Sequence, residues 1–291
     1  MFEGVYPALI TPFRESQQRD LDLDGLKSNI DFLISRGVHG IVPCGSTGES
    51  ATLTFEEHEE VIRKAIEVSD GRVPVLAGTG SNNTAEALRF TKAAKDLGAD
   101  GALVLSPYYN KPNRSGLVKH YEKLADLDIP IVIYNVPGRT GQNLLPDLII
   151  ELADYPNIVG IKEASGDISQ ISAIIEGTRD KDFTVISGDD AMTLPVLAIG
   201  GGGVISVAAN VEPKLMVNMY NKFVSGDLLG ARELHYRLAP LIRAMFIDTN
   251  PIPVKTACGI RKMAAGPLRL PLDELDSKKT EILREVLLSY D

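Results

Sequence analysis

The chain has 291 residues, of which 44% are hydrophobic and 24% charged, and its formal net charge at pH 7 is −9. This composition is that of an ordinary globular protein, and the length fits either two small domains or one large α/β barrel. The acidic balance argues against nucleic acids and anionic membranes as partners, because either would need a concentrated basic face.

The N-terminal segment shows no basic region and no apolar run of signal-peptide length, and no later stretch approaches about 18 uninterrupted apolar residues. The two cysteines, Cys44 and Cys258, are too few for a disulfide framework and show no metal-ligand spacing. We therefore expect a soluble, cytoplasmic protein.

Eight short runs rich in Val, Ile and Leu recur along the chain, and most lack polar alternation, as expected for parallel strands buried on both faces. We predict strands at residues 5–11, 39–44, 73–78, 101–107, 129–135, 158–164, 183–188 and 202–207. Helix-like segments separate them: Thr54 and Glu57 form a capping box, and Thr84 is predicted to cap a helix that continues through Leu97. Eight such units predict a (β/α)8 TIM barrel rather than an open sheet.

Everything after residue 210 has a helical pattern, with segments predicted at residues 213–225, 228–246, 253–264 and 272–289. The sequence therefore predicts a catalytic barrel over residues 1–225 and a C-terminal helical extension over residues 226–291. No linker rich in Gly, Ser or Pro separates the two, so we expect the extension to pack on the barrel.

Catalytic groups of such barrels project from the C-terminal ends of the strands. The second predicted strand ends in two hydroxyls between glycines, Gly45-Ser46-Thr47-Gly48, whose amides suit a carboxylate, although a plain turn explains the pattern equally well. The fourth and fifth strands lead into tyrosines, each of which alone fits a packing role. These tyrosines are Tyr108, Tyr109 and Tyr134.

Lys162 ends the otherwise apolar sixth strand. Burial lowers the pKa of a lysine amine below its ordinary value of about 10.4, and the free amine can attack a ketone carbonyl to form a Schiff base. The alternative is a structural lysine whose ammonium extends into water. The place of this strand in the barrel favours the nucleophile, with hydroxyls at neighbouring strand ends as a proton relay.

Other motifs favour structural roles. Asp189 after the seventh strand most simply caps the following helix, and close backbone packing explains the glycine run Gly200–Gly203 as well as a phosphate site would. Lys255 is the rival nucleophile, but it follows the barrel strands. None of the four histidines falls at a strand's C-terminal end, so a metal or histidine mechanism is unsupported.

The strand ends resemble one family, the class I pyruvate-dependent lyases typified by dihydrodipicolinate synthase and N-acetylneuraminate lyase. The resemblance covers nearly the whole chain. The paired tyrosines and Arg139 are typical of the dihydrodipicolinate synthase branch, which the chain resembles at these positions. The segments that carry the resemblance are residues 45–49, 107–112, 134–141, 160–164, 187–190 and 250–255.

The resemblance implies that Lys162 forms a Schiff base with pyruvate, that Tyr134 is the general acid and base beside it, and that Ser46 and Tyr109 complete the relay. Arg139 would receive the carboxylate of the second substrate, L-aspartate 4-semialdehyde. Substrate would also be bound by Thr47, which holds the pyruvate carboxylate, and by the main chain of Gly188 and Ile205.

The implied reaction yields 4-hydroxy-tetrahydrodipicolinate for lysine and diaminopimelate synthesis, with no metal and no cofactor beyond the covalent pyruvate adduct. In the family Tyr109 reaches into a neighbouring subunit's site, which implies a homotetramer built as a dimer of dimers.

Two positions depart from the branch. Ser46 stands where threonine is common, as in related aldolases, so the hydroxyl survives while the identity of the second substrate is less fixed. Phe55 replaces a histidine of the lysine pocket in the most sensitive relatives, so we predict weak or absent inhibition by lysine. The positions matching that pocket are Ser50, Ala51, Phe55, His58, Asn82, Glu86 and Tyr108.

Two other functions stay open from the sequence. Another class I pyruvate-dependent aldolase, cleaving a 2-keto-3-deoxy sugar acid or N-acetylneuraminate, would use the same Lys162, but a polyol needs hydroxyl partners where Arg139 offers a cation. The second alternative is a noncatalytic barrel that senses pyruvate-like ligands. Such a barrel would not need Lys162, Tyr134 and the hydroxyl set, so the presence of all of them counts against it.

Overall fold

The computed structural model describes residues 2–290, which pack as two compact units. Unit 1 holds the described residues up to Gly4 together with Val75–Ile205, and unit 2 holds Val5–Pro74 together with the described residues from Ser206 onward. The sequence predicts two consecutive regions that meet between residues 225 and 226, whereas each compact unit combines separate segments of the chain. The predicted boundary stays a prediction.

Unit 1 contains a parallel sheet in which each strand pairs with the next one in sequence, in the order β7-β6-β5-β4-β3-β2. A parallel connection needs a crossover, and helices supply it. The strands are β2 (Leu76–Gly78), β3 (Gly101–Leu105), β4 (Ile131–Asn135), β5 (Ile158–Glu163), β6 (Thr184–Ser187) and β7 (Gly203–Ser206), whose last residue already belongs to unit 2.

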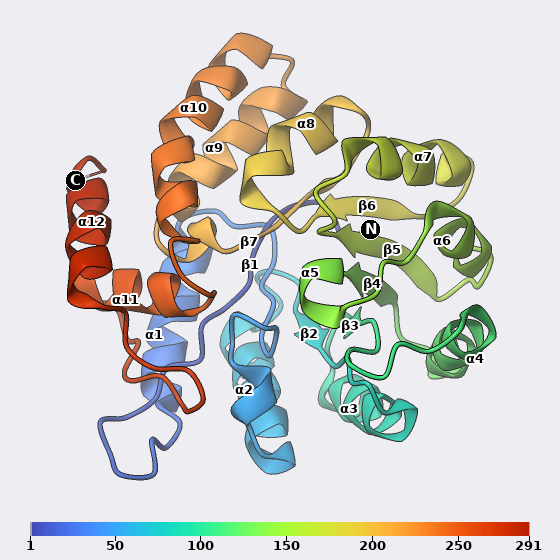
Figure 1. The fold of residues 1–291 in the computed structure, drawn as a ribbon, viewed down its shortest axis with the longest axis horizontal. Coiled ribbons are helices and arrows are strands. Elements are labelled where there is room, and N and C mark those ends of the chain that lie inside the picture. The colour runs from blue at the N-terminus through green and yellow to red at the C-terminus, as the bar shows by residue number, and fades with distance from the viewer. Residues whose placement is uncertain (1, 291) are drawn as a thin grey trace. The chain divides into compact units, whose positions relative to one another are not determined.

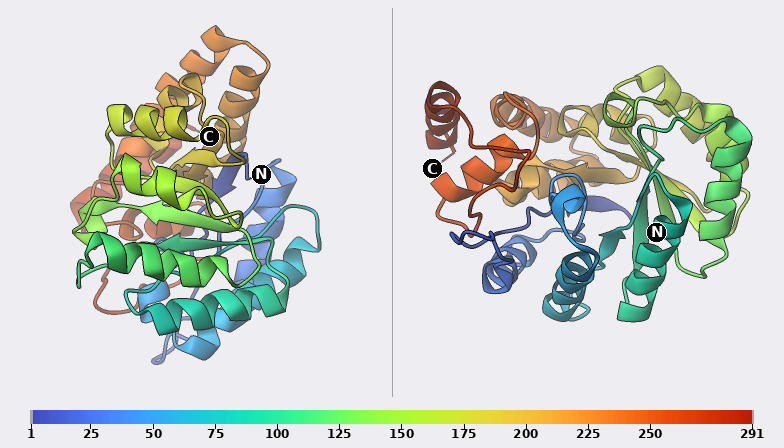
Figure 2. Two further views of the ribbon diagram at one scale, coloured as in Figure 1. Left: turned by 90° about the vertical axis from the view of Figure 1, so that its right-hand side faces the viewer. Right: turned by 60° about the horizontal axis from the view of Figure 1, so that its bottom comes forward.

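The helices of unit 1 alternate with these strands along the chain (Figure 1), and the green ones among them lie in front of the sheet in the left view of Figure 2. They are α3 (Thr84–Leu97), α4 (Arg114–Ala125), the single turn α5 (Pro137–Thr140), α6 (Pro146–Leu152), α7 (Ile168–Thr178) and α8 (Thr193–Ala198), with the 3-10 turn η2 (Asp190–Met192) before α8. This alternation of strand and helix is that of the predicted (β/α)8 barrel.

The core of unit 1 fixes which way the strand side chains point. Ile133 of β4 and Ile161 of β5 are fully buried in one cluster with apolar residues of α4, α6 and α7. Successive strand residues point to opposite faces, so Tyr134 and Lys162 face away from those helices. Asn135 and Glu163, one residue further on, face the helices again.

Unit 2 begins in β1 (Gly4–Pro7) and is otherwise mostly helical. Ala8 N–H donates to Ser206 O in this unit, and Gly4 N–H donates to Gly202 O in unit 1. The helices are α1 (Leu23–Ser35), η1 (Ser50–Thr52), α2 (Phe55–Ser69), η3 (Ala208–Asn210), α9 (Pro213–Val224), α10 (Leu228–Ala244), α11 (Ile252–Ile260) and α12 (Ser277–Leu288).

The second predicted strand is wrong. Residues 39–44 contain only the single bridge residues Ile41 and Val42, of which Val42 pairs with Ala8, and this leaves seven strands among residues 2–290. The segment still lies along β1, since Val42 N–H donates to Pro7 O, but Cys44 has φ 57°, which ends the extended conformation before a ladder forms. The other seven predicted strands are confirmed, most of them one or more residues shorter than predicted.

The predicted caps have mixed outcomes. The capping box of Thr54 and Glu57 is confirmed, and the Asp189 carboxylate caps η2 by accepting from Ala191 N–H. The cap predicted at Thr84 is wrong, because the Asn83 side chain accepts from Ala85 N–H and the Thr84 hydroxyl lies 2.9 Å from His120 Nδ1. An amide oxygen one residue earlier therefore takes the capping position.

The four C-terminal helices are confirmed as α9 to α12, with α11 and α12 shorter than predicted. None of the helices within residues 2–290 combines the length and the apolar character needed to cross a membrane.

The close packing of β5 against β6 can be tested at Gly160, because a Cβ there would lie 2.5 Å from Thr184 O on β6. We expect Gly160→Ala to lower the free energy of unfolding by about 2 kcal/mol, the usual cost of overpacking. Gly259→Ala, in an exposed helical position with no heavy atom within 4 Å, is the control and should be neutral or slightly stabilising. Urea titration of the two variants measures both, and equal stabilities would contradict the packing argument.

Candidate active site

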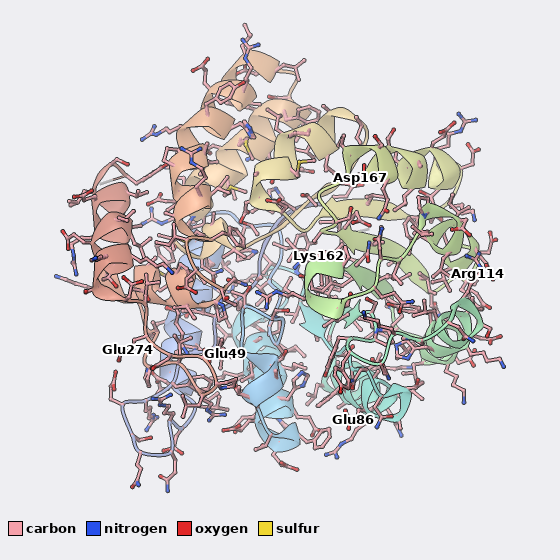
Figure 3. All side chains as sticks on the ribbon, in the orientation of Figure 1. Glu49, Glu86, Arg114, Lys162, Asp167 and Glu274 are labelled. Carbon is pink, nitrogen blue, oxygen red and sulfur yellow. The ribbon has the colours of Figure 1, made fainter. Side chains whose placement is uncertain are left out.

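Lys162 is the buried cation of unit 1, with 7% of its surface exposed. It pairs in register with Tyr134 of β4 on one side and Ile186 of β6 on the other. Its Nζ lies 4.0 Å from the centroid of the Tyr134 ring, and Tyr134 is itself 8% exposed. In Figure 3 Lys162 lies on the strand side of the unit, whereas Arg114 lies at its outer edge on α4. The structure therefore brings together two of the three predicted catalytic residues that lie in unit 1, Lys162 and Tyr134.

Gly188 and Ile205 flank the ends of the next two strands. Gly188 N–H donates to Glu163 O at 2.8 Å, and a Cβ at this position would lie 3.1 Å from Lys162 Cε and 2.7 Å from Ala164 Cβ. Glycine is thus required for the Lys162 side chain to keep its place. Ile205 is buried near the end of β7, and its proposed role in lining a pocket stays a prediction.

Tyr109 and Arg139 are exposed, in contrast with Lys162 and Tyr134. Tyr109 is 88% exposed with φ 71°, a conformation that few non-glycine residues adopt. Its N–H donates to Thr140 O at 3.3 Å, which ties it to the turn α5 that carries Arg139. Within unit 1 the predicted relay residue Tyr109 thus lies at the surface.

The predicted hydroxyl loop lies in unit 2. Thr47 is 4% exposed and its Oγ1 accepts from Asn250 Nδ2 at 3.0 Å, while Ser46 is half-buried. A hydroxyl that accepts from an amide keeps its own proton free to donate. Thr47 is therefore set up to donate to an anion, as a carboxylate site requires.

Glu49 and Lys255 form a buried ion pair behind this loop. Lys255 Nζ donates to Glu49 Oε1 at 2.5 Å and to Pro267 O at 2.8 Å, and it lies 4.1 Å from the centroid of the Phe13 ring. Burial lowers the pKa of Lys255 to about 8, against the opposing effect of Glu49. Because the amine is bound to a carboxylate and a carbonyl, the structural role predicted for Lys255 fits better than a nucleophile.

Several polar partners of the site escaped sequence reasoning. Asn250 was noted only as part of a motif, and its contact with Thr47 spans 203 residues, which no local pattern reveals. Asn143 and Gln170, which bind the polar ends of β4 and β5, carried no signal of their own. Asn135 and Glu163 could have been found, because they stand one residue after Tyr134 and Lys162 on both strands.

Cys44, at the start of the hydroxyl loop, is a buried thiol whose pKa is raised by burial, so it stays protonated. Within the described part of the chain, no group of three or more His, Cys, Asp or Glu side chains could hold a metal ion.

The chain is similar to known proteins over nearly its whole length. The model of the dihydrodipicolinate synthetase family matches residues 1–289. A 4-hydroxy-tetrahydrodipicolinate synthase of Methanoculleus marisnigri is 74% identical over 290 residues, 100% of each chain, and one of Methanosphaerula palustris is 69% identical over 291 residues, also 100% of each. A crystal structure of dihydrodipicolinate synthase from Aquifex aeolicus is 47% identical, with a TM-score of 0.96 over 99% of this chain and 98% of that one. These matches confirm the predicted (β/α)8 barrel with C-terminal helices.

Glu49→Gln tests the pair that supports the hydroxyl loop. The substitution leaves the Lys255 ammonium buried without an anion, and we expect the free energy of unfolding to fall by about 3 to 5 kcal/mol. Glu67→Gln, which breaks a solvent-exposed pair with Lys64, is the matched control and should cost no more than about 1 kcal/mol. Urea denaturation of both variants measures the difference, and similar losses would show that the buried pair is not specially important.

Proposed function

The chain belongs to the dihydrodipicolinate synthetase family, and on that premise we propose which of its residues perform the family's reaction. Its activity is that of a 4-hydroxy-tetrahydrodipicolinate synthase, a class I Schiff-base lyase in lysine and diaminopimelate biosynthesis. Pyruvate and L-aspartate 4-semialdehyde are the substrates. The curated relatives reported above give no support to the alternative sugar-acid or N-acetylneuraminate lyase.

Lys162 is the proposed nucleophile, and the single observation that carries the proposal is its buried Nζ over the Tyr134 ring. The amine attacks the C2 carbonyl of pyruvate, and loss of water from the resulting carbinolamine leaves an imine between C2 and Nζ. Once protonated, the imine withdraws electrons from the neighbouring methyl group. One methyl proton can then leave, and an enamine forms.

The enamine carbon attacks the aldehyde of the second substrate, and the new alkoxide takes up a proton. The amino group of the joined product then attacks C2, which closes the ring and releases the Lys162 amine, so that one water leaves overall. Tyr134 is the proposed group that takes and returns these protons, with Ser46 and Tyr109 completing the relay. Positioned acid and base groups of this kind contribute about 10²- to 10⁴-fold in rate.

Two kinds of donor are proposed for the two carboxylates. The Thr47 hydroxyl, oriented by Asn250, would donate to the carboxylate of pyruvate. The exposed guanidinium of Arg139 would pair with the carboxylate of the semialdehyde, because a planar cation binds a carboxylate in a charge-assisted geometry. Main-chain atoms of Gly188 and Ile205 would line the pocket. The chemistry needs no metal or further cofactor, since the protonated imine supplies the electron sink.

We also propose a cytoplasmic homotetramer, arranged as a dimer of dimers. An aromatic side chain that is 88% exposed on a backbone with φ 71° is costly unless its surroundings use it, and a neighbouring subunit that covers Tyr109 would do so. One solved relative, 43% identical to this chain with a TM-score of 0.96, is described as a monomeric variant, so the family does not impose one assembly.

Borohydride reduction in the presence of pyruvate tests the nucleophile. We expect peptide mass mapping to find the adduct on Lys162, Lys162→Ala to lose both label and activity, and Lys92→Ala, an exposed lysine of α3, to behave as wild type. Tyr134→Phe should keep the label while kcat falls about 10²- to 10⁴-fold. An adduct on Lys255 would overturn the assignment.

Lysine titration of the initial rate tests regulation. A solved relative from Cyanidioschyzon merolae, 40% identical, is described with lysine bound. Because Phe55 cannot accept or donate the hydrogen bonds of an imidazole, we expect weak or no inhibition, and Phe55→His should increase sensitivity if the missing ring is the cause. Inhibition of the unaltered chain at micromolar lysine would contradict the prediction.

A further inference from the structure

A polar network behind β4 and β5 reaches the turn that carries Arg139. We propose that Asn143 and Gln170 are positioning residues that hold this turn for the anionic second substrate. The inference rests on the proposed role of Arg139 in the synthase reaction. Neither residue needs to touch substrate, because both act through the backbone that bears the guanidinium.

The network centres on the carboxylate of Glu163, which is 1% exposed. Oε1 accepts from Ser165 N–H at 2.6 Å, and Oε2 accepts from Asn135 Nδ2 at 2.9 Å and from Gln170 Nε2 at 3.2 Å. All three partners are donors, so the carboxylate acts as a hydrogen-bond acceptor through both of its oxygens. The network therefore has this carboxylate at its base, on the face of β5 opposite to Lys162.

Asn135 and Gln170 connect the Glu163 carboxylate to Asn143 through hydrogen bonds. Asn135 Nδ2 donates to Asn143 Oδ1 at 2.8 Å, and its Oδ1 accepts from Leu144 N–H at 3.1 Å. Gln170 Nε2 donates to Asn143 Oδ1 at 3.1 Å, and Gln170 Oε1 accepts from Asn143 Nδ2 at 2.7 Å. The segment that leaves α5 is thus bound through both the backbone and a side chain.

The turn itself is short. α5 is one turn long, closed by Thr140 N–H to Val136 O at 3.0 Å and Gly141 N–H to Pro137 O at 2.9 Å. Just after the turn, Gln142 Nε2 donates to Pro112 O at 2.8 Å. The segment that follows Arg139 is therefore held by two anchors, one at the loop after β3 and the other the network at Asn143.

A misplacement of about 1 Å at a binding group can cost up to about 10²-fold in rate, so the second anchor matters for the step that uses Arg139. It does not matter for imine formation, which involves pyruvate and Lys162 on the opposite face of the strands. Loss of the anchor should therefore separate the two halves of the reaction.

Asn143→Ala is the informative variant, because Asn143 is exposed and its removal leaves the core of unit 1 intact. We expect the KM for the semialdehyde to rise about tenfold at saturating pyruvate, with the rate of borohydride trapping by pyruvate unchanged. Gln170→Ala should act in the same direction. Asn221→Ala is the matched control, since it removes an exposed asparagine of α9, outside the network and outside unit 1.

A double-mutant cycle with Arg139→Ala distinguishes positioning from a general structural effect. If Asn143 acts through Arg139, Asn143→Ala adds no further rise in KM once the guanidinium is gone. Additive effects, an equal loss of pyruvate trapping, or an unchanged KM would each overturn the proposal. Absence of trapping in the unaltered chain would instead defeat the proposed function, so the two failures are distinguishable.

Discussion

Neighbouring strands β4 and β5 pair Tyr134 with Lys162 and, one residue further on, Asn135 with Glu163. Because strand side chains alternate, this one register places a buried amine and a phenol on one face and an amide and a carboxylate on the other. A shift of one residue would exchange the two sets and put Glu163 on the face that Lys162 now occupies. Because only glycine fits against Thr184 O at position 160, a shift that brought a side chain there would be opposed by the sheet.

Two buried lysines in the same chain have opposite surroundings. Lys255 is bound to a carboxylate and a carbonyl and lies over a phenylalanine ring, so its amine is already fully used. No hydrogen bond or ion pair of Lys162 Nζ occurs among residues 2–290, and its Nζ lies 4.0 Å from the centroid of the Tyr134 ring. An amine without a competing partner can form a bond with a carbonyl carbon. The sequence does not show which of the two lysines has such a partner, so burial alone could not distinguish them.

Sequence patterns predicted the parts of the structure that depend on local chemistry. Apolar runs located seven strands, and the rule that catalytic groups follow strand ends led to Lys162 and Tyr134. The segment at 39–44 failed because a positive φ at Cys44 is a property of the folded loop rather than of its hydrophobicity. Asn250, Asn143 and Gln170 were beyond reach for another reason: Asn143 and Gln170 bond each other across 27 positions, Asn250 bonds Thr47 across 203, and only the tertiary fold brings these pairs together.

Strands and turns divide the proposed site. The proposed imine chemistry rests on two paired strands, whose geometry is fixed by many buried contacts, whereas Arg139 rests on a single helical turn held by a few side chains. Turns tolerate change better than the strands that carry them. Substitutions around Asn143 or Gln142 could therefore move Arg139 without disturbing the strands on which the proposed roles of Lys162 and Tyr134 depend. The anchoring of the Arg139 turn should therefore affect the identity of the second substrate more than the serine at position 46, where the branch commonly has threonine.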